Sequence, residues 1–283
     1  MKRSISLLAV LTVVGTNMAT AQINYGGGTY FENFNAIFNT DGTGASILGT
    51  AGAAPGPQAA VTTFTTWQAE RITGTGTGNF AIFGDWGGSA ASANGRLYSY
   101  GLPASSERAL GANATANTTV GFGTWFVNTS SDTFGSVTFS FDREIWRTQA
   151  VATDQSLSFS YGLASIGIGT ANFITNALMT AYPALNATSP SFYASIIEHP
   201  GVSGFTDPST NMVPVSATIT GLNWAPGDSL FIRWNDTLDV GSNAGIAIDN
   251  LSMTAVVGVP EPSCGALLGL GFAAVALLRR KIR

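Results

Sequence analysis

Alternation of apolar and polar residues recurs along this chain and restricts the folds that it can adopt. The pattern is clear in Val137–Phe141 and Leu157–Tyr161, and it runs with one interruption through Leu230–Asn235. A period of two places every second side chain on one face of an extended strand. Helical periodicity is rare, and its best example, Ala171–Met179, predicts one short helix. The alternation therefore favours an all-β fold.

The rest of the body contains further short segments rich in Thr, Val, Phe and Tyr, bounded by Gly, Ser, Asn and Pro. These segments are Thr29–Phe34, Asn79–Phe83, Arg96–Gly101, Thr119–Asn128 and Val215–Leu222. Many short strands separated by turn residues are typical of sandwiches and barrels. We predict an all-β protein in which residues 22–257 form a β-sandwich ectodomain with a jelly-roll-like arrangement.

The first segment, 1–21, is typical of a secretory signal peptide. It begins with basic residues, continues as an apolar stretch, and ends with small residues at the −3 and −1 positions, Ala19 and Ala21. This order of charge, short apolar run and small residues is the pattern that export signals share. We therefore expect cleavage before Gln22 and export of the remaining chain.

The segment 258–283 combines a Pro-Glu-Pro motif, an apolar run over 264–278 and a basic cluster. The motif comprises Val259, Pro260, Glu261, Pro262 and Ser263, and the basic cluster comprises Arg279, Arg280, Lys281 and Arg283. A helix over the apolar run would be roughly 22 Å long, which is shorter than a bilayer core of about 30 Å. We expect a single C-terminal transmembrane helix that stops transfer, with the basic cluster on the cytoplasmic side.

This order of elements resembles the PEP-CTERM sorting tail of bacterial proteins that are processed by exosortase. The resemblance covers Val259–Arg283. It implies that an exosortase-type membrane protease recognises the Pro-Glu-Pro motif and cuts nearby. The precursor would then be held in the inner membrane, and its body would pass to the cell envelope or the extracellular space, commonly among exopolysaccharide. An ordinary tail anchor with a chance Pro-Glu-Pro is the alternative.

A second resemblance spans residues 96–255 and is carried by six short strings. These strings are Tyr98–Gly101, Glu107–Gly111, Glu144–Arg147, Leu157–Tyr161, Arg233–Asp236 and Gly245–Asn250. Together they resemble a β-sandwich module of exported bacterial proteins that often carry the same sorting tail. The resemblance supports the predicted fold and implies no particular ligand.

Composition excludes several classes of function. The single Cys leaves no disulfide within the chain, and together with the single His it removes most zinc and thiol chemistry. A formal net charge of −4 argues against nucleic acid as a partner. The 16 Asp and Glu residues offer many chance carboxylate pairs, and a hydrolase needs two such groups about 5–10 Å apart.

A polar stretch near the end of the body is a candidate calcium site. Asp236, Asp239, Asn243 and Asp249 offer the side-chain oxygens that Ca²⁺ prefers. The spacing of these residues is not that of an EF-hand loop. A polar hairpin turn, in which Asp and Asn side chains bind the backbone, is the alternative interpretation.

The final strand of the body predicts a local irregularity. Its apolar residues change phase at Asp249–Asn250, so that the pattern before this point is out of step with the pattern after it. Such a change indicates a β-bulge, which could turn Asp249 toward a buried partner. A buried carboxylate needs an Arg, a metal or several N–H donors, and Arg233 on the preceding strand is a candidate partner.

We therefore expect a non-catalytic exported protein of the cell envelope or extracellular matrix, sorted through its tail and associated with exopolysaccharide. The first alternative is a calcium-dependent carbohydrate-binding or adhesion module, with Trp86 as the best candidate for stacking on a sugar. The second alternative is an extracellular hydrolase. No cofactor other than Ca²⁺ is expected.

Overall fold

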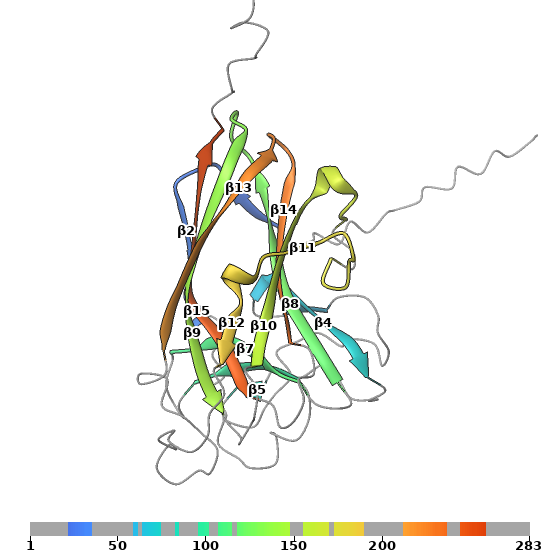
Figure 1. The fold of residues 1–283 in the computed structure, drawn as a ribbon, viewed down its shortest axis with the longest axis vertical. Helices are drawn as coiled ribbons and strands as arrows, with labels where there is room; N and C mark the ends of the chain where they lie inside the picture. The colour runs from blue at the N-terminus through green and yellow to red at the C-terminus, as the bar shows by residue number, and fades with distance from the viewer. Residues whose placement is uncertain are drawn as a thin grey trace, which may run out of the picture.

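The computed structural model describes residues 22–35, 59–61, 64–74, 83–84, 96–101, 107–114, 118–147, 155–169, 173–189, 212–236 and 244–258. These residues form two β-sheets that face each other across a shared apolar core (Figure 1). The predicted all-β fold with two packed layers is thereby confirmed. No helix in this part of the chain is both long enough and apolar enough to cross a bilayer, and the run 264–278 lies outside it.

Sheet A has eight strands, with the order β11-β10-β14-β8-β4-β3, while β1 pairs with β8 and β12 pairs with β10. Its strands are β1 (Ile23–Tyr25), β3 (Ala59–Val61), β4 (Phe64–Gly74), β8 (Thr118–Asn128), β10 (Gln155–Leu163), β11 (Thr180–Ala181), β12 (Ala187–Ser189) and β14 (Ser229–Asp236). Two short 3₁₀ turns, η3 (Ala164–Ile166) and η4 (Pro183–Leu185), lie between its strands in sequence.

Sheet B has seven strands, with the order β13-β9-β15-β7-β6-β5, while β2 pairs with β15. Its strands are β2 (Thr29–Glu32), β5 (Phe83–Gly84), β6 (Arg96–Tyr100), β7 (Ala109–Asn113), β9 (Phe134–Arg147), β13 (Val213–Trp224) and β15 (Gly245–Val257). The long strands β8, β9, β10, β13, β14 and β15 alternate between the two sheets as the chain proceeds.

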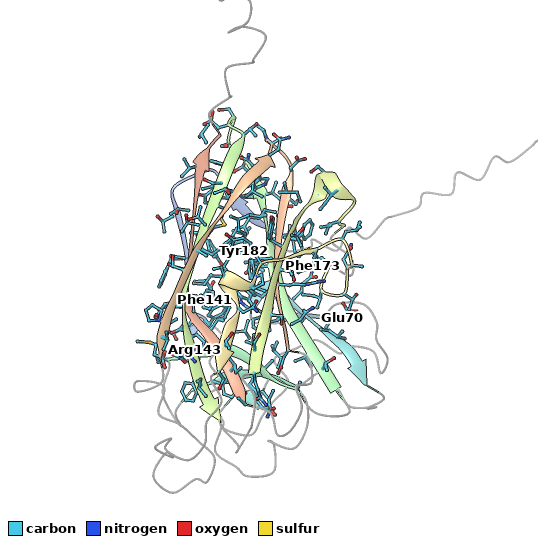
Figure 2. The ribbon with its side chains drawn as sticks, in the orientation of Figure 1. Glu70, Phe141, Arg143, Phe173 and Tyr182 are labelled. Carbon is cyan, nitrogen blue, oxygen red and sulfur yellow. The ribbon has the colours of Figure 1, made fainter. Side chains whose placement is uncertain are left out.

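The aromatic side chain of Trp234 lies at the centre of the core. Its ring centroid is 6.3 Å from that of Trp67 and 6.0 Å from that of Phe122, both on sheet A. Phe141 of sheet B meets it edge-on at 5.5 Å, and Phe159 meets it at 5.0 Å. Figure 2 places Phe141 between the two layers. Burial of these rings supplies much of the apolar free energy that holds the sheets together.

A smaller apolar cluster lies on the other side of sheet A, away from the core. Phe231 and Trp125 point outward from β14 and β8, and Phe173 and Ile174 cover them. The helix that we expected over Ala171–Met179 is wrong for its described part, because residues 173–179 form a series of turns. Apolar residues in this segment are spaced to cover the outward aromatic rings rather than to line one side of a helix.

The outer side of sheet B carries rows of hydroxyl side chains across β2, β15, β9 and β13. We call this surface the hydroxyl face. It comprises Thr29, Ser136, Thr138, Ser140, Ser216, Thr218, Thr220, Ser252 and Thr254. Strand pairing aligns these residues in three rows that run across the sheet. All nine are exposed or half-buried. Neighbouring strands are linked by hydroxyl hydrogen bonds, at 2.7 Å between Thr138 and Thr218 and at 2.8 Å between Ser140 and Ser252.

The central position of Trp234 predicts a large loss of stability when its side chain is removed. We expect Trp234→Ala to lower the free energy of unfolding by about 3–5 kcal/mol, because it leaves a cavity among four aromatic rings. Phe31, which is 56% exposed at the edge strand β2, provides the control. Phe31→Ala should change stability by about 0.5 kcal/mol or less. Urea unfolding measures both, and similar losses in the two variants would contradict the assignment of Trp234 to the centre of the core.

Candidate functional site

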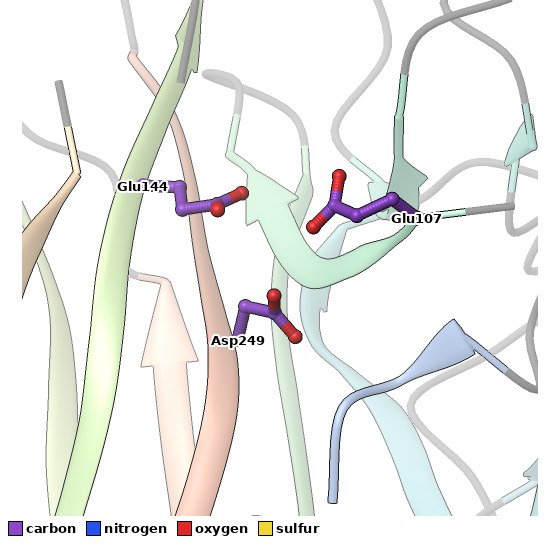
Figure 3. Close-up of side chains that lie close together, drawn as sticks. All are labelled: Glu107, Glu144 and Asp249. Atoms are coloured by element: carbon purple, nitrogen blue, oxygen red, sulfur yellow. The ribbon is translucent and has the colours of Figure 1, made fainter. Parts of the chain in front are cut away.

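Three carboxylates from separate parts of sheet B converge on the side that faces away from the core. Each of Glu107, Glu144 and Asp249 offers one oxygen, and these oxygens all lie within 4.8 Å of one another. Figure 3 shows Glu144 on β9, Asp249 on β15 and Glu107 just before β7, with their carboxylates pointing toward a common centre. Glu144 and Asp249 are each only 3% exposed, whereas Glu107 is exposed. We call these three residues the carboxylate cluster.

Strand register explains why the three groups meet. β15 pairs with both β9 and β7, with Ala247 opposite Glu144 on one side and opposite Gly111 on the other. Any side chain at Gly111 would collide with the carbonyl of Ile246 and with Ala247, so glycine allows the two strands to approach. Side chains at alternate positions of a strand share one face. Asp249 therefore lies on the same side as Ala247.

The predicted β-bulge at Asp249–Asn250 is confirmed. The register between β15 and β9 shifts between Asp249 and Ser252, and Asn250 has a positive φ of 50°. Because of this extra residue, Ile248 before the bulge and Leu251 after it both face the central core. Asp249 itself is buried as expected, but on the outer side of sheet B rather than between the sheets.

Arg233 does not pair with Asp249, so that expectation was wrong. Its side chain lies on the outer side of sheet A, where Nη1 donates to the carbonyl oxygens of Phe173, Ile174 and Asn176 at 2.9, 2.6 and 3.0 Å. The nearby carboxylate of Glu70 acts on Arg233 electrostatically. Figure 2 labels Glu70 and Phe173 in this region. Arg233 thus fixes the segment 173–179 to the sheet.

Burial dominates the electrostatics of the carboxylate cluster. It raises the pKa of Glu144 to about 7, the negative charges of Glu107 and Asp142 act in the same direction, and a hydrogen bond from Trp146 lowers it. Burial also raises the pKa of Asp249, and the charges of Glu144 and Glu107 add to this effect. The charged groups that act on the two buried acids are therefore all negative. Such an arrangement requires neutralisation by protons or by a cation.

An aromatic stack lies beside the cluster on the same side of sheet B. The rings of Tyr100 and Trp146 are stacked, with centroids 5.8 Å apart, and Tyr98 is 5.2 Å from Tyr100. These three rings are at most 2% exposed. The indole Nε1 of Trp146 donates to Oε2 of Glu144 at 2.7 Å. The stack keeps water from one side of Glu144 and fixes the orientation of its carboxylate.

The structure separates two of the residues that we predicted to bind Ca²⁺ together. Asp236 is buried at the end of β14, where Oδ2 accepts a hydrogen bond from the backbone N–H of Ala114 at 2.6 Å. Within the part of the chain that the structure describes, the acidic group around Asp249 contains Glu107 and Glu144 and does not contain Asp236. Asp239 and Asn243 lie outside the described residues, so the four-residue calcium site stays a prediction.

Sequence reasoning missed Glu107 and Glu144 as partners of Asp249. One sequence signal could have identified Glu144: it is an acidic residue inside a strand, and its neighbours Arg143 and Ile145 are also buried. Among the residues of the predicted export and sorting signals, the structure describes only Gln22. Ala19, Ala21, the motif 259–263 and the basic cluster at 279–283 all lie outside the described residues, and Gln22 is exposed.

Comparisons with known proteins assign no family. No protein-family model and no curated protein matches the chain. Among solved structures, the chain has a weak similarity to the arabinose-bound MgGH51 α-L-arabinofuranosidase, at 12% identity and a TM-score of 0.31, over 83% of this chain and 29% of that one. It is also similar to the adhesin domain of Epf from Streptococcus pyogenes, at 10% identity and a TM-score of 0.24, over 82% and 59%. The chain thus spans less than two thirds of either structure.

The raised pKa values predict how stability depends on pH when divalent cations are removed by a chelator. Unfolded carboxyls release their protons near pH 4, whereas folded Glu144 keeps its proton up to about pH 7. The folded state therefore binds more protons in this window, and its stability falls as the pH rises from about 4 through about 7. Urea unfolding at several pH values should show this loss, and Glu144→Gln should reduce it. If the stability of the unmodified chain and that of Glu144→Gln depended equally on pH, the raised pKa of Glu144 would be contradicted.

The contacts of Arg233 predict that its replacement loosens the segment 173–179. Arg233→Met leaves three carbonyl oxygens without their donor and removes the positive charge near Glu70, so we expect a loss of about 3 kcal/mol or more. Amide hydrogen exchange in 173–179 should become faster. Leu178→Ala serves as the control in the same segment, because Leu178 is 55% exposed. Unchanged exchange in Arg233→Met would show that these hydrogen bonds do not hold the segment.

Proposed function

We propose that this chain is a non-catalytic protein of the cell envelope or extracellular matrix, exported through its N-terminal signal and sorted by an exosortase-type membrane protease. The main structural support is the junction between the body and the Pro-Glu-Pro motif. β15 ends at Val257, and the N–H of Gly258 still donates to the carbonyl of Thr133 at 2.9 Å. The motif begins at the next residue, Val259. Cleavage at or beyond the motif would therefore leave every strand that the structure describes intact.

The remaining parts of the tail have separate roles in this proposal. A transmembrane helix over 264–278 holds the precursor in the inner membrane, and the basic cluster keeps the end of the tail on the cytoplasmic side. After cleavage the sandwich is free to enter the envelope or the surrounding exopolysaccharide. The alternation of successive long strands between the sheets supports the jelly-roll-like arrangement that we assign to the released body.

A calcium-dependent carbohydrate-binding or adhesion module is a second candidate. Two observations favour it, namely the carboxylate cluster as a candidate cation site and the exposed and half-buried hydroxyl groups of the hydroxyl face. A glycan array measured with and without chelator distinguishes the two candidates, since only the second requires glycan binding that the chelator abolishes.

A hydrolase is less well supported by the same geometry. General acid and base groups must reach the substrate, and Glu144 and Asp249 are each only 3% exposed. This burial favours a structural role for the carboxylate cluster over a catalytic one.

The sorting proposal predicts that changes in the motif block processing. In the native host, the unmodified chain should give a shortened product in the envelope or medium. The variant Pro260→Ala/Glu261→Ala/Pro262→Ala should accumulate as a full-length precursor in the membrane fraction. Asp132→Asn, an exposed change in the turn between β8 and β9, should be processed normally. Cell fractionation with intact-mass measurement reads out all three proteins, and equal shortening of the motif variant would refute recognition of the motif.

A further inference from the structure

We infer that Glu107, Glu144 and Asp249 bind one hard divalent cation, best matched by Ca²⁺, on the outer side of sheet B. This site differs from the four-residue set that the sequence suggested, and it shares only Asp249 with it. The inference rests on the geometry of β7, β9 and β15 and does not depend on the sorting proposal.

The spacing of the oxygens fits a calcium ion. Calcium–oxygen distances in proteins are about 2.3–2.6 Å, so two ligand oxygens on opposite sides of the ion are at most about 4.6–5.2 Å apart. The three carboxylates offer oxygens that lie within 4.8 Å of one another. Figure 3 shows the three groups directed toward the space that they share. An ion at this position can contact all three side chains without any change of strand register.

A second observation comes from the bonding of Asp249. The backbone N–H of Asn250 and the side chain of Glu107 form hydrogen bonds with its carboxyl group. Its Oδ1, in a residue that is only 3% exposed, is nevertheless buried and has no hydrogen-bond partner. A buried carboxylate oxygen without a donor is costly unless a cation or a proton neutralises it. The charges acting on Asp249 come from Glu144 and Glu107, and both are negative. The site therefore lacks the positive group that its buried oxygen needs, and a bound cation supplies one.

Ligand chemistry favours calcium over softer or smaller ions. The cluster offers only carboxylate oxygens, and these suit hard cations rather than zinc or copper. Calcium accepts six to eight oxygens in an adaptable geometry, whereas magnesium demands a near-ideal octahedron. Glu107 is exposed, which leaves room for water to complete the coordination shell. Trp146 holds Oε2 of Glu144, a contact of the kind that orients metal-binding carboxylates.

Cation binding would join three strands that are distant in sequence. Glu107 precedes β7, Glu144 lies on β9 and Asp249 lies at the bulge of β15. A ligand that binds only the folded state stabilises that state by an amount that grows with the logarithm of the ligand concentration once this exceeds the Kd. Affinities of extracellular calcium modules are commonly in the range of about 10⁻⁴–10⁻³ M. If the body is exported as proposed above, the site would be filled outside the cell.

Thermal unfolding and calorimetric titration of the purified full chain, after treatment with chelator, test this inference. We expect one Ca²⁺ per chain and a rise of about 5–10 °C in Tm when calcium exceeds its Kd a hundredfold. Asp249→Asn should abolish both effects. It should fold without calcium, because it removes a buried negative charge and keeps the shape of the side chain. Glu144→Gln, a second neutral isostere, should weaken binding at least tenfold.

Asp132→Asn is the matched control, because it makes the same chemical change at an exposed turn. It should retain the full calcium response. An unchanged midpoint of the unmodified chain at about 100 mM calcium, a hundredfold above the weakest expected Kd, would overturn the inference. An equal response in Asp249→Asn and Asp132→Asn would also overturn it. Equal shifts with Ca²⁺ and Mg²⁺ would overturn the assignment to calcium.

Discussion

β15 pairs with three strands of sheet B, and the arrangement of the remaining structure depends on this pairing. β9 runs along one side of it, while β7 and β2 occupy successive parts of the other side. The bulge at Asp249–Asn250 changes the phase of the strand between these two parts. Without the extra residue, Ile248 and Leu251 could not both face the core. The bulge also leaves Asp249 on the outer side of the sheet.

The same strand connects the core, the carboxylate cluster and the tail. Apolar side chains on one side of β15 pack against sheet A. On the other side, Asp249 meets Glu144 of β9 and Glu107, which precedes β7. Its last residue, Val257, lies two positions before the Pro-Glu-Pro motif begins. A cation at the cluster would therefore stabilise the strand from which the tail extends. In the sorting proposal, folding of the body and presentation of the motif would be linked through this one element.

Local sequence patterns predicted the long strands β8, β9, β10, β13, β14 and β15 because alternation reports which side chains are buried, but they missed the long strand β4. Leu230, Ile232 and Trp234 face the core, whereas Arg233 faces outward, as their alternation indicates. β7 was missed because Ala109–Asn113 has little of the β-branched or aromatic character that marks a strand. It is a strand because Gly111 allows β15 to approach, which is a long-range effect.

The candidate site was harder to predict than the fold. The phase change identified the bulge and the burial of Asp249, because both depend on neighbouring residues in the chain. Its partners Glu107 and Glu144 are brought to it by the pairing of β15 with β7 and β9, and no local pattern reports such a register. Arg233 was nearer in sequence, but it belongs to the opposite sheet.

A crystal structure of the full chain grown with calcium is the most direct measurement of this arrangement. It should show one ion at the bulge of β15, with an oxygen from each of Glu107, Glu144 and Asp249 at about 2.3–2.6 Å. Carboxylates that instead share protons with one another, with no ion between them, would contradict the proposed role of the cluster.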